Sequence, residues 1–275
     1  MPPFKQLAEF ESSVNDKLYK GLYKSLELTT SERDEHADTI RQVLATVGFD
    51  VNSLEWWGRW HIGRSALHVA CNRKIRSSVG AKILLRDERC DVNLTDCLGE
   101  TALMTAVKWV RSDDDQYAEI IRLLLAHPHI NINMKSANWN NNQTALHKAS
   151  VADIKSHVGA QLLISDKRCD VNVLDSEGNT PLMKAVRLAK YRHDKHAKII
   201  RLLLAHPRID VNLKGYHGKN TFHGEVHIRK LLQKREYDIY KRLNLESHHT
   251  TSLHVACDLT AQSAAVAESQ EMRCQ

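Results

Sequence analysis

Histidine is the residue type that most invites a chemical role, because the chain contains sixteen of them. Zinc sites place their ligands at set spacings, such as H-E-x-x-H on a helix or pairs of closely spaced cysteines. The nearest match is HGEVH at His223–His227, where the glutamate stands one position too late. The six cysteines are scattered and form no C-x-x-C pair. We therefore expect no metal site and no cofactor.

Motifs for phosphate binding or nucleophilic catalysis are also missing from the sequence. It contains neither a G-x-x-x-x-G-K-[ST] loop nor a G-x-S-x-G elbow. The acidic run Asp113–Asp115 favours a solvated turn over a cation site. The members of a catalytic triad need not be adjacent, so motif searches leave such a set open. Nothing distinguishes one serine or cysteine, however, and we expect a protein that is not an enzyme.

The composition is that of an ordinary soluble protein, with 275 residues, 42% of them hydrophobic and 26% charged. No stretch approaches the roughly 18 apolar residues that a membrane helix needs. The start, MPPFKQLAEFESS, lacks the basic and apolar segments of a secretory signal. Scattered cysteines without a disulfide framework are typical of reduced thiols inside the cell. These features predict an intracellular protein of the cytoplasm or the nucleus.

The elements that would position functional side chains come as a repeated unit. Residues 178–212, GNTPLMKAVRLAKYRHDKHAKIIRLLLAHPRIDVN, predict a turn, a short helix, a loop, a longer helix and an extended segment. Thr180 suits the cap of the first helix and Pro181 its first position, while Pro207 would stop the second helix. A unit of this size cannot bury both of its apolar faces, so it needs copies of itself on either side.

Copies of the unit are present at a fixed offset. Residues 99–133 repeat its text, and the offset is 79, the difference between Leu103 and Leu182. A second motif occurs at 63–93 and again at 142–172, with the same offset. A block of two motifs has therefore been duplicated.

Two phrases recur in all four stretches. The first, of the type T-P-L-H-x-A, occurs at Ser65–Ala70, Thr101–Ala106, Thr144–Ala149 and Thr180–Ala185. The second, of the type D-V-N, occurs at Asp91–Asn93, Asn131–Asn133, Asp170–Asn172 and Asp210–Asn212. Four such pairs in register resemble the ankyrin repeat. The resemblance implies an all-α fold, an ankyrin-repeat α-solenoid of stacked helix pairs with β-hairpin or turn tips.

The resemblance also predicts how the chain is divided. Residues 1–52 would form a helical N-terminal cap with a leading, half-matched repeat. Residues 53–213 would hold four clear repeats, at about 63–94, 99–134, 142–173 and 178–213. The pattern decays over 214–257, which we expect to be degenerate repeats, and 258–275 reads as a disordered tail. The chain's end suits either a frayed terminus or a truncated gene product.

The resemblance implies structural roles for several histidines. His68, His147, His223 and His254 fill the histidine of the first phrase, which in the family bonds neighbouring backbone. His127 and His206 close the predicted second helices, where a cation would meet the negative end of the helix dipole.

The predicted function is a non-enzymatic scaffold or adaptor that binds another protein through hairpin tips and inner helices. Tryptophans mark two enlarged tips, and aromatic or basic residues mark the inserts between helices. The candidate partner-binding residues are Trp56, Trp57, Trp60, Trp109, Trp139, Tyr191 and Arg192. Exposed tryptophans anchor protein interfaces. The three tryptophans of 53–62 are equally suited to fold back over the leading cap, and Trp109, Tyr117 and Tyr191 to pack between helices.

Charge offers a second hypothesis. The formal net charge is +6, and the basic residues gather toward the C-terminus. Residues 187–201 hold six basic residues and one acid, whereas the equivalent 108–122 hold three and four. The alternative function is a regulatory or inhibitory subunit that binds an acidic or nucleic-acid-associated partner through residues 187–242. A solvated helix face explains the same charges. We expect a monomer that does not itself bind nucleic acid.

Overall fold

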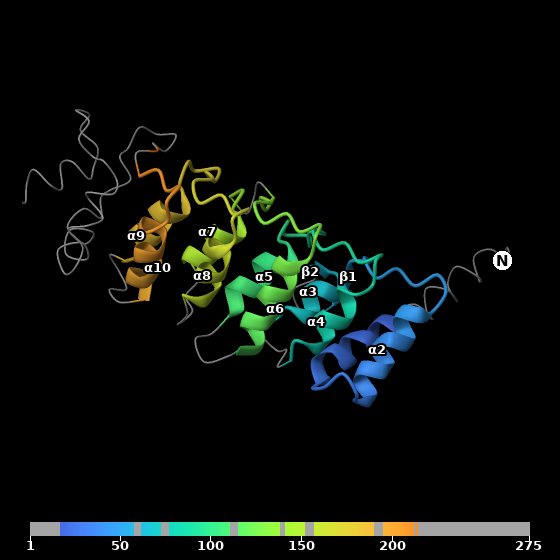
Figure 1. Cartoon of the computed structure of the whole chain (residues 1–275). Helices are drawn as coiled ribbons and strands as arrows, with labels where there is room; N and C mark the ends of the chain where they lie inside the picture. Colours follow the sequence, from blue (N-terminus) through green and yellow to red (C-terminus); the bar gives the residue numbers. More distant parts are fainter. Residues whose placement is uncertain are drawn as a thin grey trace, which may run out of the picture. The chain divides into compact units, whose positions relative to one another are not determined.

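The computed structural model describes residues 17–57, 62–72, 77–110, 115–137, 141–151, 157–189, 195–211 and 213. Two compact units divide the chain, Met1–Cys169 and Asp170–Gln275. Most of the regular structure is helical (Figure 1). After a helix at 17–28, the first unit contains α2 (Glu35–Ala45), β1 (Glu55–Trp57), β2 (Ile62–Arg64), α3 (Ala66–Ala70), α4 (Val79–Leu84), α5 (Ala102–Trp109), α6 (Asp115–Ala126), α7 (Ala145–Val151) and α8 (Val158–Ser165). The second contains α9 (Pro181–Ala189) and α10 (Lys195–Leu204).

The first unit is built from stacked helix pairs, as the repeats predicted. The members of each pair are α3 with α4, α5 with α6, and α7 with α8. The first helices contact one another in the order α3, α5, α7, and the second helices in the order α2, α4, α6, α8, which makes two rows (Figure 1). Each pair thus covers the apolar flanks of the next. The largest fully buried side chains between the rows include Leu84, Leu103, Ile120, Ile121, Leu124, Leu146 and Leu163.

The helix at 17–28 packs on the start of this stack. Leu22 and Leu26 are fully buried on its inner side. The Tyr19 hydroxyl donates to the backbone carbonyl of Asp50 at 2.6 Å, and the Tyr23 hydroxyl donates to that of Arg64 at 3.0 Å. These bonds tie the helix to the loop after α2 and to β2.

Threonine and aspartate side chains cap the N-termini of two helices in this unit. Thr101 precedes α5 in extended conformation, and its Oγ1 accepts from the Met104 amide at 3.3 Å. Asp34 precedes α2, and its Oδ1 accepts from the Ala37 amide at 2.7 Å. Each cap satisfies one of the amides that the first helical turn leaves without a partner.

The described part of the second unit contains one helix pair, α9 and α10, which follows the repeat pattern. Helix α9 begins at Pro181, and the Thr180 Oγ1 accepts from the Met183 amide at 3.2 Å, which confirms the predicted cap. Helix α10 ends at Leu204, three residues before the predicted stop at Pro207. The two helices pack against each other through buried Leu182, Met183, Val186, Ile199, Ile200 and Leu203.

The tips between helix pairs are tight turns organised by a carboxylate. The Asp96 Oδ1 accepts from the amides of Leu98 and Glu100, each at 2.9 Å. Gly99 has a φ of 68°, and a Cβ there would clash with the backbone of Ala137 in the next tip. Glycine is therefore required at this close approach.

One tip is extended into a two-stranded hairpin. Strands β1 and β2 pair antiparallel, with Glu55 opposite Arg64, Trp56 opposite Gly63 and Trp57 opposite Ile62. This hairpin is the insert at 53–62 that the sequence singled out.

Asparagine side chains join each tip to the next. The Asn93 amide group donates to the His129 carbonyl at 2.6 Å and accepts from the Asn131 amide at 2.7 Å. The same pair of bonds is made by Asn52 within the first unit and by Asn172 within the second. The last residue of the D-V-N phrase therefore sets the register between neighbouring repeats.

Candidate interaction surface

The structure places three of the seven candidate partner-binding residues. The backbones of Trp56 and Trp57 lie in β1 of the extended hairpin. Trp109 is the last residue of α5, where it is half-buried and the Lys108 Nζ lies 5.6 Å from its ring centroid. The remaining candidates, Trp60, Trp139, Tyr191 and Arg192, lie outside the described residues.

Tyr117 is a packing residue, as one sequence interpretation held. Its side chain on α6 is buried, and its hydroxyl donates to the Asn72 carbonyl at 2.7 Å. This bond joins α6 to the chain after α3 in the neighbouring repeat. The tyrosine therefore holds two repeats together and is not available to a partner.

The histidines of the first phrase are structural where the structure describes them. His68 is fully buried, with Nδ1 2.8 Å from the Ser65 hydroxyl and Nε2 2.8 Å from the Glu100 carbonyl. These partners fit a neutral ring that donates through Nε2. Burial lowers the pKa of His68 and favours that neutral form. His147 repeats the contact with Thr144, at 2.9 Å.

The two histidines that end the second helices behave differently from the prediction. Burial lowers the pKa of His127, with a smaller contribution from His129. It also lowers the pKa of His206, where Arg208 contributes. In each case Nδ1 accepts from the amide two residues later, at 3.4 Å from His129 and 3.2 Å from Arg208. The rings act as neutral turn acceptors, so the predicted role as cations at the helix end is wrong.

Arginines take the cationic role in the alternate repeats. The Arg89 guanidinium donates to the Leu44 carbonyl at 2.6 Å, near the end of α2, and forms a two-pronged pair with Asp87. The Arg168 guanidinium does the same with the Leu125 carbonyl at 2.5 Å and with Asp166. Hydrogen bonding to the arginines is the largest cause that lowers the pKa of both aspartates. Sequence reasoning missed this clamp, although D-x-R recurs at the repeat offset.

Buried ion pairs support the tips of the first unit from beneath. The Lys148 Nζ on α7 lies 2.6 Å from the Glu100 Oε1, with both side chains largely buried. The Arg64 Nε lies 3.7 Å from the buried Oδ2 of Asp96. Removing one member of such a pair leaves a charge without compensation in the interior. These charges therefore belong to the frame of the repeats.

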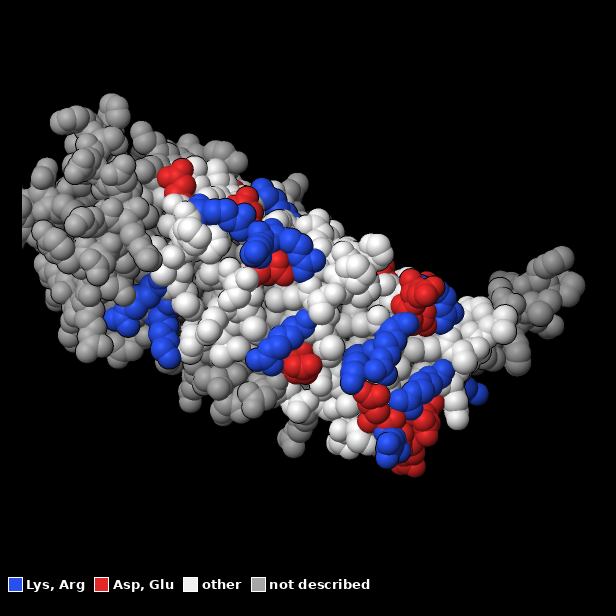
Figure 2. All heavy atoms as spheres, viewed as in Figure 1, with Lys and Arg blue, Asp and Glu red and all other residues white. Residues whose placement is uncertain are grey.

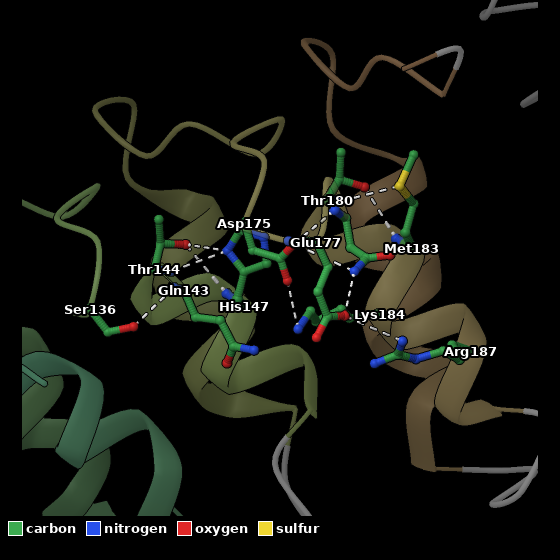
Figure 3. A network of polar contacts seen from close by, with 11 residues as sticks. Ser136, Gln143, Thr144, His147, Asp175, Glu177, Thr180, Met183, Lys184 and Arg187 are labelled. Carbon is green, nitrogen blue, oxygen red and sulfur yellow. Dashed lines mark hydrogen bonds and ion pairs between the residues drawn. The ribbon is translucent and has the colours of Figure 1, made fainter. Parts of the chain in front are cut away.

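The second unit holds its own version of this support (Figure 3). The Lys184 Nζ on α9 lies 2.6 Å from the Asp175 Oδ2, and both side chains are almost fully buried. The other Asp175 oxygen accepts from the amides of Glu177 and Asn179, at 2.9 and 2.8 Å. Arg187 lies at the exposed edge of this network, 3.6 Å from Glu177.

One groove of the first unit contains a thiol that is poorly suited to act as a nucleophile. This groove, with a volume of about 670 Å³, lies among residues 85–92 and 127–129. Its thiol, Cys90, is buried, and burial raises its pKa to about 12. A thiol with so high a pKa stays protonated and is a poor nucleophile. No group of His, Cys, Asp or Glu suited to a metal ion occurs among the residues described.

Many exposed charged side chains form ion pairs, and some do not. Over the first unit, basic side chains lie beside acidic ones on the face in view (Figure 2). The exposed ion pairs here include Glu32 with Lys82 and Arg86, Asp38 with Arg41, Asp87 with Arg89, Glu119 with Arg122, and Asp166 with Arg168. In the second unit, Lys198 and Arg201 are exposed on α10 and have no ion-pair partner within the described residues. No helix in that same part of the chain is long and apolar enough to cross a membrane.

Comparisons with known proteins agree with the repeat geometry. A family model described as "Ankyrin repeats (3 copies)" matches residues 30–136 and 116–215. Over 131 residues the chain is 33% identical to neurogenic locus notch homolog protein 1 of Xenopus laevis, which is 48% of this chain but only 4% of that protein.

Solved structures show the same fold. The crystal structure of an ankyrin repeat protein aligns with a TM-score of 0.56 and 20% identity, covering 84% of this chain and 97% of that one. An ankyrin repeat domain from Acinetobacter baumannii AYE aligns with a TM-score of 0.54 and 20% identity, covering 82% and 96%. At this level of identity the likeness concerns the fold alone.

Proposed function

The chain belongs to the ankyrin-repeat family, and from this premise we propose that it is a scaffold or adaptor, not an enzyme, that binds another protein through its hairpin tips and inner helices. Its fold class is the all-α stack of ankyrin repeats that the sequence predicted. Ankyrin repeats are generally protein–protein interaction modules, and the family is typically non-enzymatic. The adaptor role and the residues that contact the partner are our proposal.

One observation carries the proposal: between the duplicated helices α6 and α10 the apolar stacking residues are kept, whereas the surface charge changes. Helices α6 and α10 share a buried core of Ile120, Ile121 and Leu124 in one and Ile199, Ile200 and Leu203 in the other. At the exposed position before that core, Glu119 of α6 becomes Lys198 of α10. Stacking constrains the buried residues, whereas the surface charge is free to be shaped by a partner.

The proposed contact residues are those that the sequence assigns to the enlarged tips and to the inserts between helices, namely Trp56, Trp57, Trp60, Trp109, Trp139, Tyr191 and Arg192. The antiparallel pairing of β1 with β2 supports this for the extended hairpin, because a hydrogen-bonded ribbon presents its side chains with little loss of backbone entropy on binding. Tryptophan and arginine are enriched among the residues that contribute most to protein interfaces.

Proximity labelling followed by pull-down with the purified chain would identify the partner. The double variant Trp56→Ala with Trp57→Ala should then lose most of that partner while its melting temperature stays unchanged. Val47→Ser is a suitable control, because Val47 is fully exposed elsewhere on the first unit. A lower melting temperature with undiminished partner binding would assign the tryptophans to the packing of the leading cap and contradict this part of the proposal.

The basic region at 187–242 supports a second candidate function, a regulatory or inhibitory subunit for an acidic or nucleic-acid-associated partner. The favouring observation is that Lys198 and Arg201 are both exposed, lie three residues apart on α10 and form no ion pair within the described residues. We further propose that the protein acts as a monomer in the cytoplasm or nucleus, with the repeat boundaries given above. Light scattering would test the oligomeric state, and cell fractionation would test the compartment.

A further inference from the structure

We infer that the outward face of α10, which carries Lys198 and Arg201, binds an acidic protein segment. This inference rests on the proposed function, a protein-binding module, and names the chemistry of one partner surface. It concerns the second unit alone and makes no use of the tryptophan tips.

The duplicated helix α6 shows what this face looks like without such a role. There, Glu119 and Arg122 lie one turn apart and form an ion pair of 3.4 Å. The same two positions in α10, 79 residues later, are Lys198 and Arg201. A favourable pair has thus become two like charges one turn apart, which destabilise a helix. Carboxylates supplied by a partner would offset that repulsion.

The two cations are held on a rigid surface. Ile199, Ile200 and Leu203 of α10 are buried, and α10 packs on α9. The side of α10 opposite these three residues therefore faces outward. Lys198 and Arg201 are both exposed on that side. Three helical residues correspond to about 4.5 Å along the axis. A partner helix with acidic residues three or four positions apart presents carboxylates at a matching interval.

The loop after α10 differs from the loop after α6 at two positions that change charge. His129, which follows α6, is replaced by the exposed Arg208 after α10. The backbone of this loop is fixed, because the Arg208 carbonyl accepts from the Asn172 side chain at 2.7 Å. Asn131 is also replaced by Asp210, so the loop gains one positive and one negative charge, and the net gain of positive charge lies on α10 itself.

The distribution of acids favours a protein partner over a nucleic acid. Asp170, Glu177 and Asp210 are exposed in the tips of this same unit. Nucleic-acid binding relies on many phosphate contacts spread along a backbone, and acidic tips oppose such a spread. A short acidic segment needs only the narrow cationic face. Arginine also pairs with a carboxylate through two parallel hydrogen bonds, which adds directional preference.

The test measures binding of the full chain to a fluorescein-labelled helical peptide whose glutamates repeat every third and fourth position. Fluorescence anisotropy should report saturable binding at low salt. Lys198→Glu restores the charge pattern of α6, so the fold should persist with an unchanged or higher melting temperature. Replacing attraction by repulsion at this exposed site should weaken peptide binding by about tenfold. Arg201→Gln should weaken it as well, by a smaller factor.

Glu119→Gln is the matched control, because it removes a charge at the equivalent position of α6. It should leave peptide binding unchanged. Equal binding by wild type, Lys198→Glu and Arg201→Gln would overturn the inference. A gain in binding by Glu119→Gln as large as the loss in Arg201→Gln would also overturn it, because binding would then follow net charge alone. Tighter binding of a duplex oligonucleotide or of phosphatidylserine vesicles than of the peptide would also overturn it, in favour of a phosphate-bearing surface.

The outcomes separate this inference from the proposed function. If the peptide does not bind but the Trp56 and Trp57 tip still captures a partner, the α10 inference fails and the adaptor role stands. If Lys198→Glu abolishes peptide binding while the tip variant has no effect on any partner, the α10 surface stands and the assignment of the tip fails.

Discussion

The asparagine that joins neighbouring tips allows a sharp test of how strongly the repeats are coupled. The Asn93 side chain donates to the His129 carbonyl at 2.6 Å and accepts from the Asn131 amide at 2.7 Å, so Asn93→Ala removes two hydrogen bonds between repeats. Each bond contributes about 0.5–1.5 kcal/mol, and both lie at an exposed site where water replaces part of the loss. We expect the free energy of unfolding to fall by about 2 kcal/mol.

The assay is urea unfolding followed by circular dichroism, together with a thermal melt. For a unit of this size, a loss of about 2 kcal/mol lowers the melting temperature by roughly 4–8 °C. Asn93→Asp should fall between the wild type and the alanine variant, because it keeps the acceptor and loses the donor. If the repeats become less tightly coupled, the slope of the urea transition should also decrease.

A control in the same phrase separates coupling from local turn stability. The Asn131 side chain accepts from the Asn133 amide at 3.2 Å, a bond within one tip. Asn131→Ala should therefore cost less than about 1 kcal/mol. If Asn93→Ala were no more destabilising than Asn131→Ala, the bonds between tips would not hold the repeats together and the reasoning would be refuted.

Two further predictions concern burial and pH. Leu203→Asp places an unpaired charge at a fully buried position of α10 and should destabilise its helix pair by more than about 4 kcal/mol; an unchanged melt by circular dichroism would show that Leu203 is not interior. Asp34 accepts from the amides of Thr30, Ser31 and Ala37, and these bonds hold its pKa well below the usual range, the Thr30 amide contributing most. Because the folded pKa is depressed, the associated stability is present above about pH 4 and is lost as the pH falls further. The melting temperature of the wild type should thus drop more between pH 5 and 3 than that of Asp34→Ala, and parallel curves would contradict the assignment.

Much of the fold was predictable because its signals are local. Pro181 and Thr180 mark the start of α9 through backbone chemistry within one turn, and the apolar spacing of Ile199, Ile200 and Leu203 marks the buried side of α10. The structural role of His68 followed from its phrase. Such features depend on neighbours a few residues away, which every copy of the repeat carries with it.

The candidate site was predicted less completely. Of the residues proposed as anchors, Trp56 and Trp57 were placed correctly in an inserted hairpin, since a longer spacing between repeats is visible in the sequence. The neutral state of His127 was not predicted, because the sequence analysis considered only the favourable position of a cation at the C-terminal end of a helix. Burial and the nearby His129 lower the pKa of His127, and both depend on packing.

By itself, the sequence determined the repeat unit, its caps, its buried positions and the change from Glu119 to Lys198, because each is a property of residue type and spacing. Only the tertiary structure decided the partners across repeats: Arg89 reaches the Leu44 carbonyl and Lys148 reaches Glu100. Those pairs are 45 and 48 residues apart in the chain. They meet because stacking brings a helix of one repeat against the preceding one, and the geometry of that contact is set by all of the packed side chains together.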